Sequence, residues 1–214
     1  GTANVGVGLQ SLYYNQTGSK NVGIGNNSLG AGGAGGNFSN NTAVGYDALR
    51  DVTTGSNNVA IGTCALENNT TANENVAIGR CSMFANTTGT QNIAIGSYAL
   101  DSNTTGDHNV AMGYLASCTM TEGNRNVGIG RAALQSTTTP NDNTAVGDQT
   151  LGNNQSGAGN TAIGRGAMLG NTTASDNTAV GCYAMLSNTT GIRNLGISKC
   201  ALGNNTTASD NMAI

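Results

Sequence analysis

Five cysteines and a single histidine are the side chains of this sequence best suited to covalent or metal chemistry. Cys64 and Cys81 are 17 residues apart, and a fold that repeated with this period would stack them within reach of a disulfide. We therefore identify Cys64 and Cys81 as a candidate disulfide, with free thiols at loop positions as the alternative. No two cysteines have Cys-x-x-Cys spacing and His108 is the only histidine, so we predict no metal site.

The acidic side chains show no pattern typical of acid–base catalysis or calcium binding. They are scattered along the chain without a recurring pair, whereas such sites need carboxylates at fixed separations. Short glycine patterns such as Gly128-Ile129-Gly130 lack the Lys-Ser/Thr ending and the following helix of a phosphate-binding loop. We predict no catalytic residue, no cofactor and no enzymatic activity.

Eight of the Asn-x-Ser/Thr sequons recur at one place of a repeat and are candidates for N-glycosylation, which needs an accessible loop of a secreted protein. The alternative is turn chemistry, in which the amide and hydroxyl groups bond the local backbone. Pairs of threonines within most sequons would also form rows of hydroxyl groups that could bind a glycan or, less readily, ice. The sequons begin at Asn15, Asn69, Asn86, Asn103, Asn154, Asn171, Asn188 and Asn205.

These side chains are positioned by a repeat, Asn-x-Ala/Gly-Val/Ile-Gly-x-x-Ala/Ser-Leu, that recurs along the chain. Its leading Asn returns every 17 residues, except for a gap of 20 between Asn21 and Asn41. That gap contains a Gly-rich insertion at 30–37, which we interpret as a loop. The leading residues are Asn4, Asn21, Asn41, Asn58, Asn75, Asn92, Asn109, Asn126, Asn143, Asn160, Asn177, Asn194 and Asn211.

We number the places of the repeat 1 to 17 from this Asn, and call one repeat a coil. Place 4 is aliphatic or Met throughout, and place 9 is mostly Leu or Met, so we predict that these two columns form the core. Place 3 is always Ala or Gly; it faces the other side of the strand, where it would let another chain approach closely. Place 5 is Gly except at Ser198, which indicates a tight corner.

The period and the residue types predict an all-β fold, a parallel β-solenoid with one 17-residue repeat per coil. The period is too short for common two-helix repeats, and Gly, Asn and β-branched residues disfavour helix. Stacked coils, about 4.8 Å apart, would place identical residues in ladders, and the amides at place 1 would bond from coil to coil. This structural Asn ladder is expected to include Asn41, Asn58, Asn75, Asn92, Asn109, Asn126, Asn143, Asn160, Asn177 and Asn194.

The composition excludes several other classes of protein. The chain has 33 Gly, no Trp and 2 Phe, too little bulk for an ordinary globular core. Only 9% of residues are charged, the net charge is −3 and no basic patch occurs, so neither nucleic acid nor a membrane is a predicted partner. No apolar run approaches membrane-spanning length.

Units such as Asn41-Thr42-Ala43-Val44-Gly45-Tyr46-Asp47-Ala48-Leu49 and Asn177-Thr178-Ala179-Val180-Gly181 resemble the repeats of trimeric autotransporter adhesin heads and of related phage and viral tail-fibre proteins. The resemblance covers nearly the whole chain. The 17-residue unit with its Asn-Thr-Thr-Gly turn is closer to the fibre-protein repeats than to the shorter adhesin-head coils. The resemblance implies a left-handed parallel β-roll, usually assembled as a homotrimer, that acts in adhesion or receptor contact.

We therefore expect residues 1–214 to form one continuous array of about twelve coils, as a piece of a longer fibre. The expected function is structural or adhesive: an extracellular, cell-surface or virion rod for surface display or attachment. The expected partners are copies of the chain itself, as a homotrimer or a head-to-tail polymer, and cell-surface glycans or a receptor. The alternative is a carbohydrate-binding module, or less readily an ice-binding one, that uses a repeated Asn/Thr face.

Overall fold

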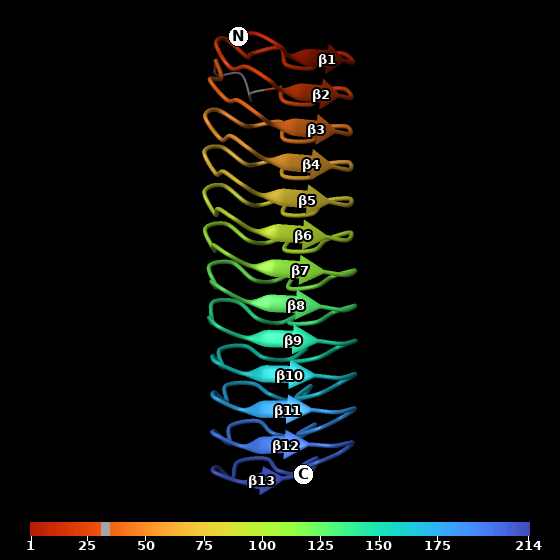
Figure 1. Ribbon diagram of the computed structural model, residues 1–214, viewed down its shortest axis with the longest axis vertical. Helices are drawn as coiled ribbons and strands as arrows, with labels where there is room; N and C mark the ends of the chain where they lie inside the picture. Colours follow the sequence, from red (N-terminus) through yellow and green to blue (C-terminus); the bar gives the residue numbers. More distant parts are fainter. Residues whose placement is uncertain (31–34) are drawn as a thin grey trace. The chain divides into compact units, whose positions relative to one another are not determined.

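The computed structural model describes residues 1–30 and 35–214 of the chain. Residues 31–34, within the predicted insertion at 30–37, lie outside the described residues. The described part contains thirteen short strands and no helix (Figure 1), so it offers no helix with the length and hydropathy of a membrane span. The chain divides into two compact units, Gly1–His108 and Asn109–Ile214.

The first unit contains six strands that pair side by side in chain order, all parallel. The coil period sets the register, so that Val59 pairs with Val76 and Ala60 with Ala77. The register survives the longer second coil, where Val22 pairs with Thr42. The strands are β1 (Val5–Val7), β2 (Val22–Ile24), β3 (Thr42–Val44), β4 (Val59–Ile61), β5 (Val76–Ile78) and β6 (Ile93–Ile95).

The second unit repeats this arrangement with seven strands. Thr161 pairs with Thr144 on one side and with Thr178 on the other, so place 2 always meets place 2. The predicted all-β parallel solenoid with one repeat per coil is confirmed; its handedness stays a prediction. The strands are β7 (Val110–Met112), β8 (Val127–Ile129), β9 (Thr144–Val146), β10 (Thr161–Ile163), β11 (Thr178–Val180), β12 (Leu195–Ile197) and β13 (Met212–Ala213).

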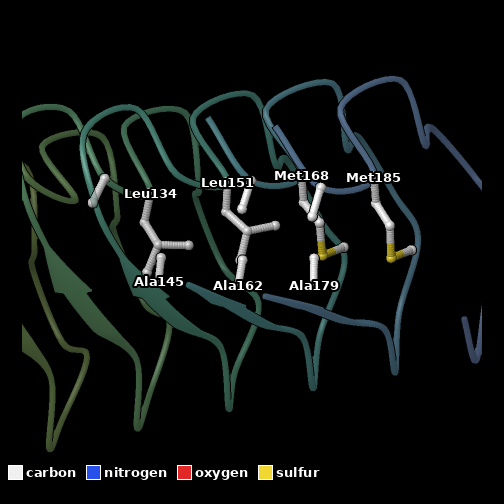
Figure 2. Packing of buried hydrophobic residues seen from close by; sticks show 10 residues of the cluster. Leu134, Ala145, Leu151, Ala162, Met168, Ala179 and Met185 are labelled. Atoms are coloured by element: carbon white, nitrogen blue, oxygen red, sulfur yellow. The ribbon is translucent and has the colours of Figure 1, made fainter. Parts of the chain in front are cut away.

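The core lies between the strand layer and the returning half of each coil. Place 9 belongs to it as predicted: Leu49, Leu66 and Leu100 are fully buried. Figure 2 shows place 9 of the second unit, where Leu151 and Met168 point from the returning segment toward the alanines of the strands. The alanines at place 8 complete this narrow interior.

Two predictions about the strand side chains are wrong. Place 4 was expected in the core, but Ile61 is 39% exposed, whereas Ala60 beside it at place 3 is fully buried. Place 3 therefore faces inward and cannot receive another chain. Alternate residues of a strand face opposite sides, and the thin interior already holds the large place-9 side chain, so only the small member of the alternation fits inside.

The place-5 glycines form the corner that follows each strand. Gly130 has a φ of 131°, which side chains rarely adopt. A β-carbon there would lie 2.6 Å from the carbonyl carbon of Gly147, the same place in the next coil. Both backbone conformation and space therefore favour glycine along this column, in which Ser198 is the exception.

Three further places adopt left-handed backbone without needing glycine. In the coil 58–74, Cys64, Leu66 and Glu74 have φ values of 56°, 51° and 60°, at places 7, 9 and 17. A left-handed leucine is unfavourable by itself. Burial of its side chain and the coil-to-coil bond from its amide to the Ser82 oxygen, 3.0 Å long, offset this cost.

Ser198 is the one non-glycine at place 5, with a φ of 132°. Because this conformation strains a residue with a β-carbon, Ser198→Gly is expected to raise the free energy of unfolding by about 1 kcal/mol or more. Chemical denaturation monitored by circular dichroism measures the change. Ser198→Ala keeps the β-carbon and is expected to match the wild type; equal stability of the glycine and alanine variants would contradict the assignment of strain.

Candidate functional site

The outward side chains at places 2 and 4 of each strand form a surface that we call the aliphatic face. In the first unit Ile24, Ile61 and Ile93 are 38–40% exposed, and in the second unit Met112 and Ile163 are 38% and 41% exposed. No coil has a charged residue at places 2, 3 or 4. The aliphatic face is thus uncharged throughout and apolar at place 4 of every coil, while place 2 is Thr at Thr42, Thr144, Thr161 and Thr178.

The leading asparagines form the first of two buried amide ladders. Asn160 donates its backbone N–H to Oδ1 of Asn143 at 3.0 Å, and its own Oδ1 accepts the backbone N–H of Asn177 at 3.1 Å. Its Nδ2 donates to Oδ1 of Asn143 and to the Ala174 carbonyl oxygen. Each leading amide therefore satisfies a buried backbone group of the next coil, which explains why only Asn occurs at place 1.

The sequon asparagines at place 12 form the second ladder, inside the solenoid. Six of them are fully buried: Asn69, Asn86, Asn103, Asn154, Asn171 and Asn188. They are therefore not on an accessible loop, and their bonds to the local backbone are those of the turn-chemistry alternative. The amide points inward because Nδ2 donates to the carbonyl oxygen of place 15 in its own coil, as Asn86 does to Gly89 at 3.0 Å.

This burial bears directly on glycosylation of the folded chain. The Nδ2 of Asn86 donates hydrogen bonds to the Gly89 carbonyl oxygen and to the Asn69 Oδ1. A glycan on this nitrogen would remove one of these bonds, and the sugar would have to occupy the packed interior. The fold cannot accommodate glycans at the six buried sequons. Asn15 and Asn205 are partly buried, and their Nδ2 atoms make the same bond to the place-15 carbonyl.

The place-12 ladder is less demanding than the leading one. Its amides bond mainly to one another and within their own coil, and the Oδ1 of Asn171 has no hydrogen-bond partner among the described residues. Val52, Met120 and Thr137 take the same place in other coils and are equally buried. Replacement is tolerated here because no backbone N–H of the next coil depends on this side chain.

The threonine rows divide into a structural row and an exposed one. At place 13 the Oγ1 of Thr70 donates to the Thr87 carbonyl oxygen at 3.1 Å, and Thr87 repeats this with Thr104. Thr71 and Thr88, at place 14, are exposed. A glycan- or ice-binding surface would therefore have one free row of threonines, instead of the two rows suggested by the sequence.

One cluster in the first unit has the residue types of a metal site. Asp47, Cys64 and Glu67 place their potential ligand atoms within 4.8 Å of one another, and both carboxylates are buried. Arg50 supplies the positive charge, with ion pairs to Glu67, Asp51 and Asp47. Desolvation, followed by the nearby Glu67 carboxylate, raises the pKa of the Cys64 thiol to about 12, so it stays protonated. The cluster is a salt-bridge network built around Arg50.

The predicted disulfide partners lie in adjacent coils at place 7. Both thiols are free in this structure, and each is half-buried. The amide of Cys81 donates to the Thr63 oxygen at 2.9 Å, which keeps the two coils in register at this corner. The pairing of Cys64 with Cys81 stays a prediction. His108 is an exposed residue at place 17, where neighbouring coils carry other polar side chains.

Asp101, at place 10, is the carboxyl whose pKa burial raises. The pKa of Asp101 is higher in the folded than in the unfolded chain, so folding disfavours its ionised form. The free energy of unfolding should therefore fall as the pH rises from the unfolded-state pKa through the folded-state pKa. Asp101→Asn is therefore expected to melt above the wild type at neutral pH and equally with it at about pH 2–3, below both pKa values. Asp210→Asn is the control with opposite sign, since Arg193 lowers the pKa of Asp210.

Comparison with known proteins identifies no relative: no family model, no curated protein and no solved structure matches this chain. Any function must therefore be argued from the repeat, the aliphatic face and the ladders.

Proposed function

We propose that this chain is a structural segment of an extracellular or virion fibre, and that copies of it associate side by side through the aliphatic face. The observation that supports this most directly is the exposure of uncharged aliphatic side chains in every strand. Monomeric soluble proteins rarely expose contiguous apolar patches larger than a few hundred Å². The place-4 column is aliphatic or Met in every coil of each unit, so its exposed side chains form a continuous apolar stripe of the kind that marks an interaction surface.

A second copy of the chain is the partner that fits this surface best. Side chains on the face recur with the coil spacing of about 4.8 Å, so a partner must present groups at the same spacing to pack between them. Another copy has that spacing because it has the same repeat. Its own aliphatic face carries no charge, so the contact requires no desolvation of charged groups. Association would also contribute apolar burial that the narrow core of alanine and one large residue per coil cannot supply.

The repetition also favours a fibre over a binding module. A fibre needs length and stiffness, and the coils supply both through in-register strands and amide ladders. A carbohydrate- or ice-binding module would need a flat polar array, for which the exposed place-14 threonines provide a single row. Display or attachment outside the cell is thus the function that these features support best.

Charged substitutions on the aliphatic face test the proposal. The triple variant Ile61→Lys, Ile78→Lys and Ile95→Lys places charges on three successive coils of the first unit. It is expected to be monomeric where the wild type is oligomeric, because the lysines would have to be desolvated in the interface. Analytical ultracentrifugation measures the mass, and circular dichroism checks that the β-structure is retained.

The matched control changes the exposed threonines of the same three coils: Thr71→Lys, Thr88→Lys and Thr105→Lys. This variant is expected to associate like the wild type. A wild-type chain that stays monomeric over the accessible concentration range would refute side-by-side association. If only the threonine variant dissociates, the contact surface is the row of exposed place-14 threonines, which would favour the binding-module alternative.

A further inference from the structure

The corner that follows each strand brings together side chains from places 6 and 7 of adjacent coils. The backbone amide of Tyr183 donates to the Arg165 oxygen at 2.9 Å, and the Arg165 guanidinium carbon lies 4.9 Å from the centre of the Tyr183 ring. Arg80 and Tyr98 repeat the same contact in the first unit, at 5.4 Å. A side chain at place 6 therefore reaches the side chain at place 7 of the next coil.

Cys182 and Cys200 occupy this pair of places in the coils 177–193 and 194–210. The amide of Cys200 donates to the Cys182 oxygen at 3.0 Å, which limits the separation of the two α-carbons to less than about 7 Å. Disulfides span α-carbon distances of roughly 4.4–6.8 Å. Cys182 is half-buried and Cys200 is exposed, so a small reagent can reach both thiols.

We propose that Cys182 and Cys200 are a redox-active pair that closes a disulfide between adjacent coils when the folded chain meets a low-molecular-weight disulfide such as glutathione disulfide. The pair is distinct from Cys64 and Cys81, which share place 7, and the inference does not rest on the proposed fibre function.

Charge distinguishes the two pairs of cysteines. The Arg165 Nη2 lies 3.9 Å from the Cys182 sulfur, so a positive charge lies beside the sulfur that attacks glutathione disulfide, a molecule of net negative charge. Cys64 lies instead beside the buried Glu67 and Asp47 carboxylates; desolvation first, and then the nearby Glu67 carboxylate, raise the pKa of its thiol to about 12. Oxidation should therefore proceed first at Cys182 and Cys200.

The reaction balances with two molecules of reduced glutathione as products. The Cys182 thiolate attacks one sulfur of glutathione disulfide, forms a mixed disulfide and releases the first glutathione thiolate. The Cys200 thiolate then attacks the Cys182 sulfur, forms the cross-coil disulfide and releases the second glutathione thiolate. The two cysteines lose two electrons, which reduce glutathione disulfide, and the two thiol protons end on the released glutathiones. The product ties the coil 194–210 to its neighbour.

Tryptic peptide mapping of the full chain tests the proposal. The folded protein is incubated with glutathione disulfide, remaining thiols are alkylated, and trypsin cleaves the chain after its arginines and lysines, which include Arg80, Arg165 and Lys199. Peptides 166–193 and 200–214 are expected to be joined by a disulfide before peptide 51–80 is joined to peptide 81–125. In guanidinium chloride, where the chain is unfolded, this preference is expected to disappear.

Arg165→Met tests the role of charge, and Arg80→Met is its matched control, because Arg80 makes the same stacking contact with a tyrosine in another pair of coils. Arg165→Met is expected to slow formation of the linked peptides by about threefold to tenfold, whereas Arg80→Met leaves the rate unchanged. Three results would overturn the inference: mixed glutathione disulfides without a link, earlier closure of the Cys64–Cys81 pair, or equal rates for the two arginine variants.

Discussion

Gly130→Ala is expected to be the most damaging small substitution in the second unit, with a loss of at least about 3 kcal/mol in the free energy of unfolding. The residue has a φ of 131°, and the new β-carbon would meet backbone atoms of Gly147 and, at 3.1 Å, the Asp148 nitrogen. Backbone cannot rotate away as a side chain can. To relieve the overlap, the coils must separate, which breaks the hydrogen bond from the Gly147 amide to the Ile129 oxygen.

Gly128→Ala is the control for this substitution, two residues earlier in the same coil. Its β-carbon would face the core, where the nearest atom is the Ser117 Oγ at 2.7 Å, the end of a side chain that can rotate. Most coils already carry Ala at this place. Urea denaturation of both variants should show a small change for Gly128→Ala; equal losses would contradict the assignment of place 5 as a corner closed to side chains.

Asn160→Val is expected to cost about 2–4 kcal/mol, because it leaves the buried backbone N–H of Asn177 without its acceptor. That N–H donates to the Asn160 Oδ1 at 3.1 Å, and the substitution also removes the bonds from Nδ2 to Asn143 and to the Ala174 oxygen. Valine has a similar volume, so the loss reflects hydrogen bonding more than packing. Thermal and urea denaturation measure the change.

Asn171→Val is the matched comparison, since Asn171 lies in the same coil, is equally buried and donates to the same Ala174 oxygen at 3.1 Å. No backbone N–H of the next coil depends on Asn171 in the described hydrogen bonds, and Val52 occupies the same place in another coil. We expect a loss of about 1 kcal/mol or less. A larger loss for Asn171→Val than for Asn160→Val would show that the two ladders have been ranked in the wrong order.

The difference between the ladders shows how a repeat can be read. A polar residue that is the same in every coil lies next to its own copies, which can accept and donate its hydrogen bonds. The unvarying Asn at place 1 therefore predicts an amide ladder. Place 12 varies among Asn, Val, Met and Thr, a tolerance that is also typical of an exposed turn. The sequons allowed both an accessible loop and a turn bonded to the local backbone, and only the structure shows that this turn forms a second buried ladder.

The places with left-handed backbone also could not all be predicted from the sequence. Glycine at place 5 is visible in the sequence because the backbone conformation and the space there strongly favour it, with Ser198 as the exception. Leu66 adopts a φ of 51° although leucine has no preference for that conformation. Only the neighbouring coils, which bury the side chain and accept its amide hydrogen bond, make it favourable, so a local pattern could not have revealed it.

The sequence by itself determined the architecture, because a strict 17-residue period with aliphatic, glycine and asparagine columns permits stacked parallel coils and little else. The tertiary structure decided which side of each strand is the interior. Ala or Gly at place 3 and the aliphatic residues or Met at place 4 are all apolar and differ mainly in size, so the polarity of these two columns does not show which one is inside. The choice follows from the space left beside the place-9 side chains, which depends on the distance between the two layers of the coil.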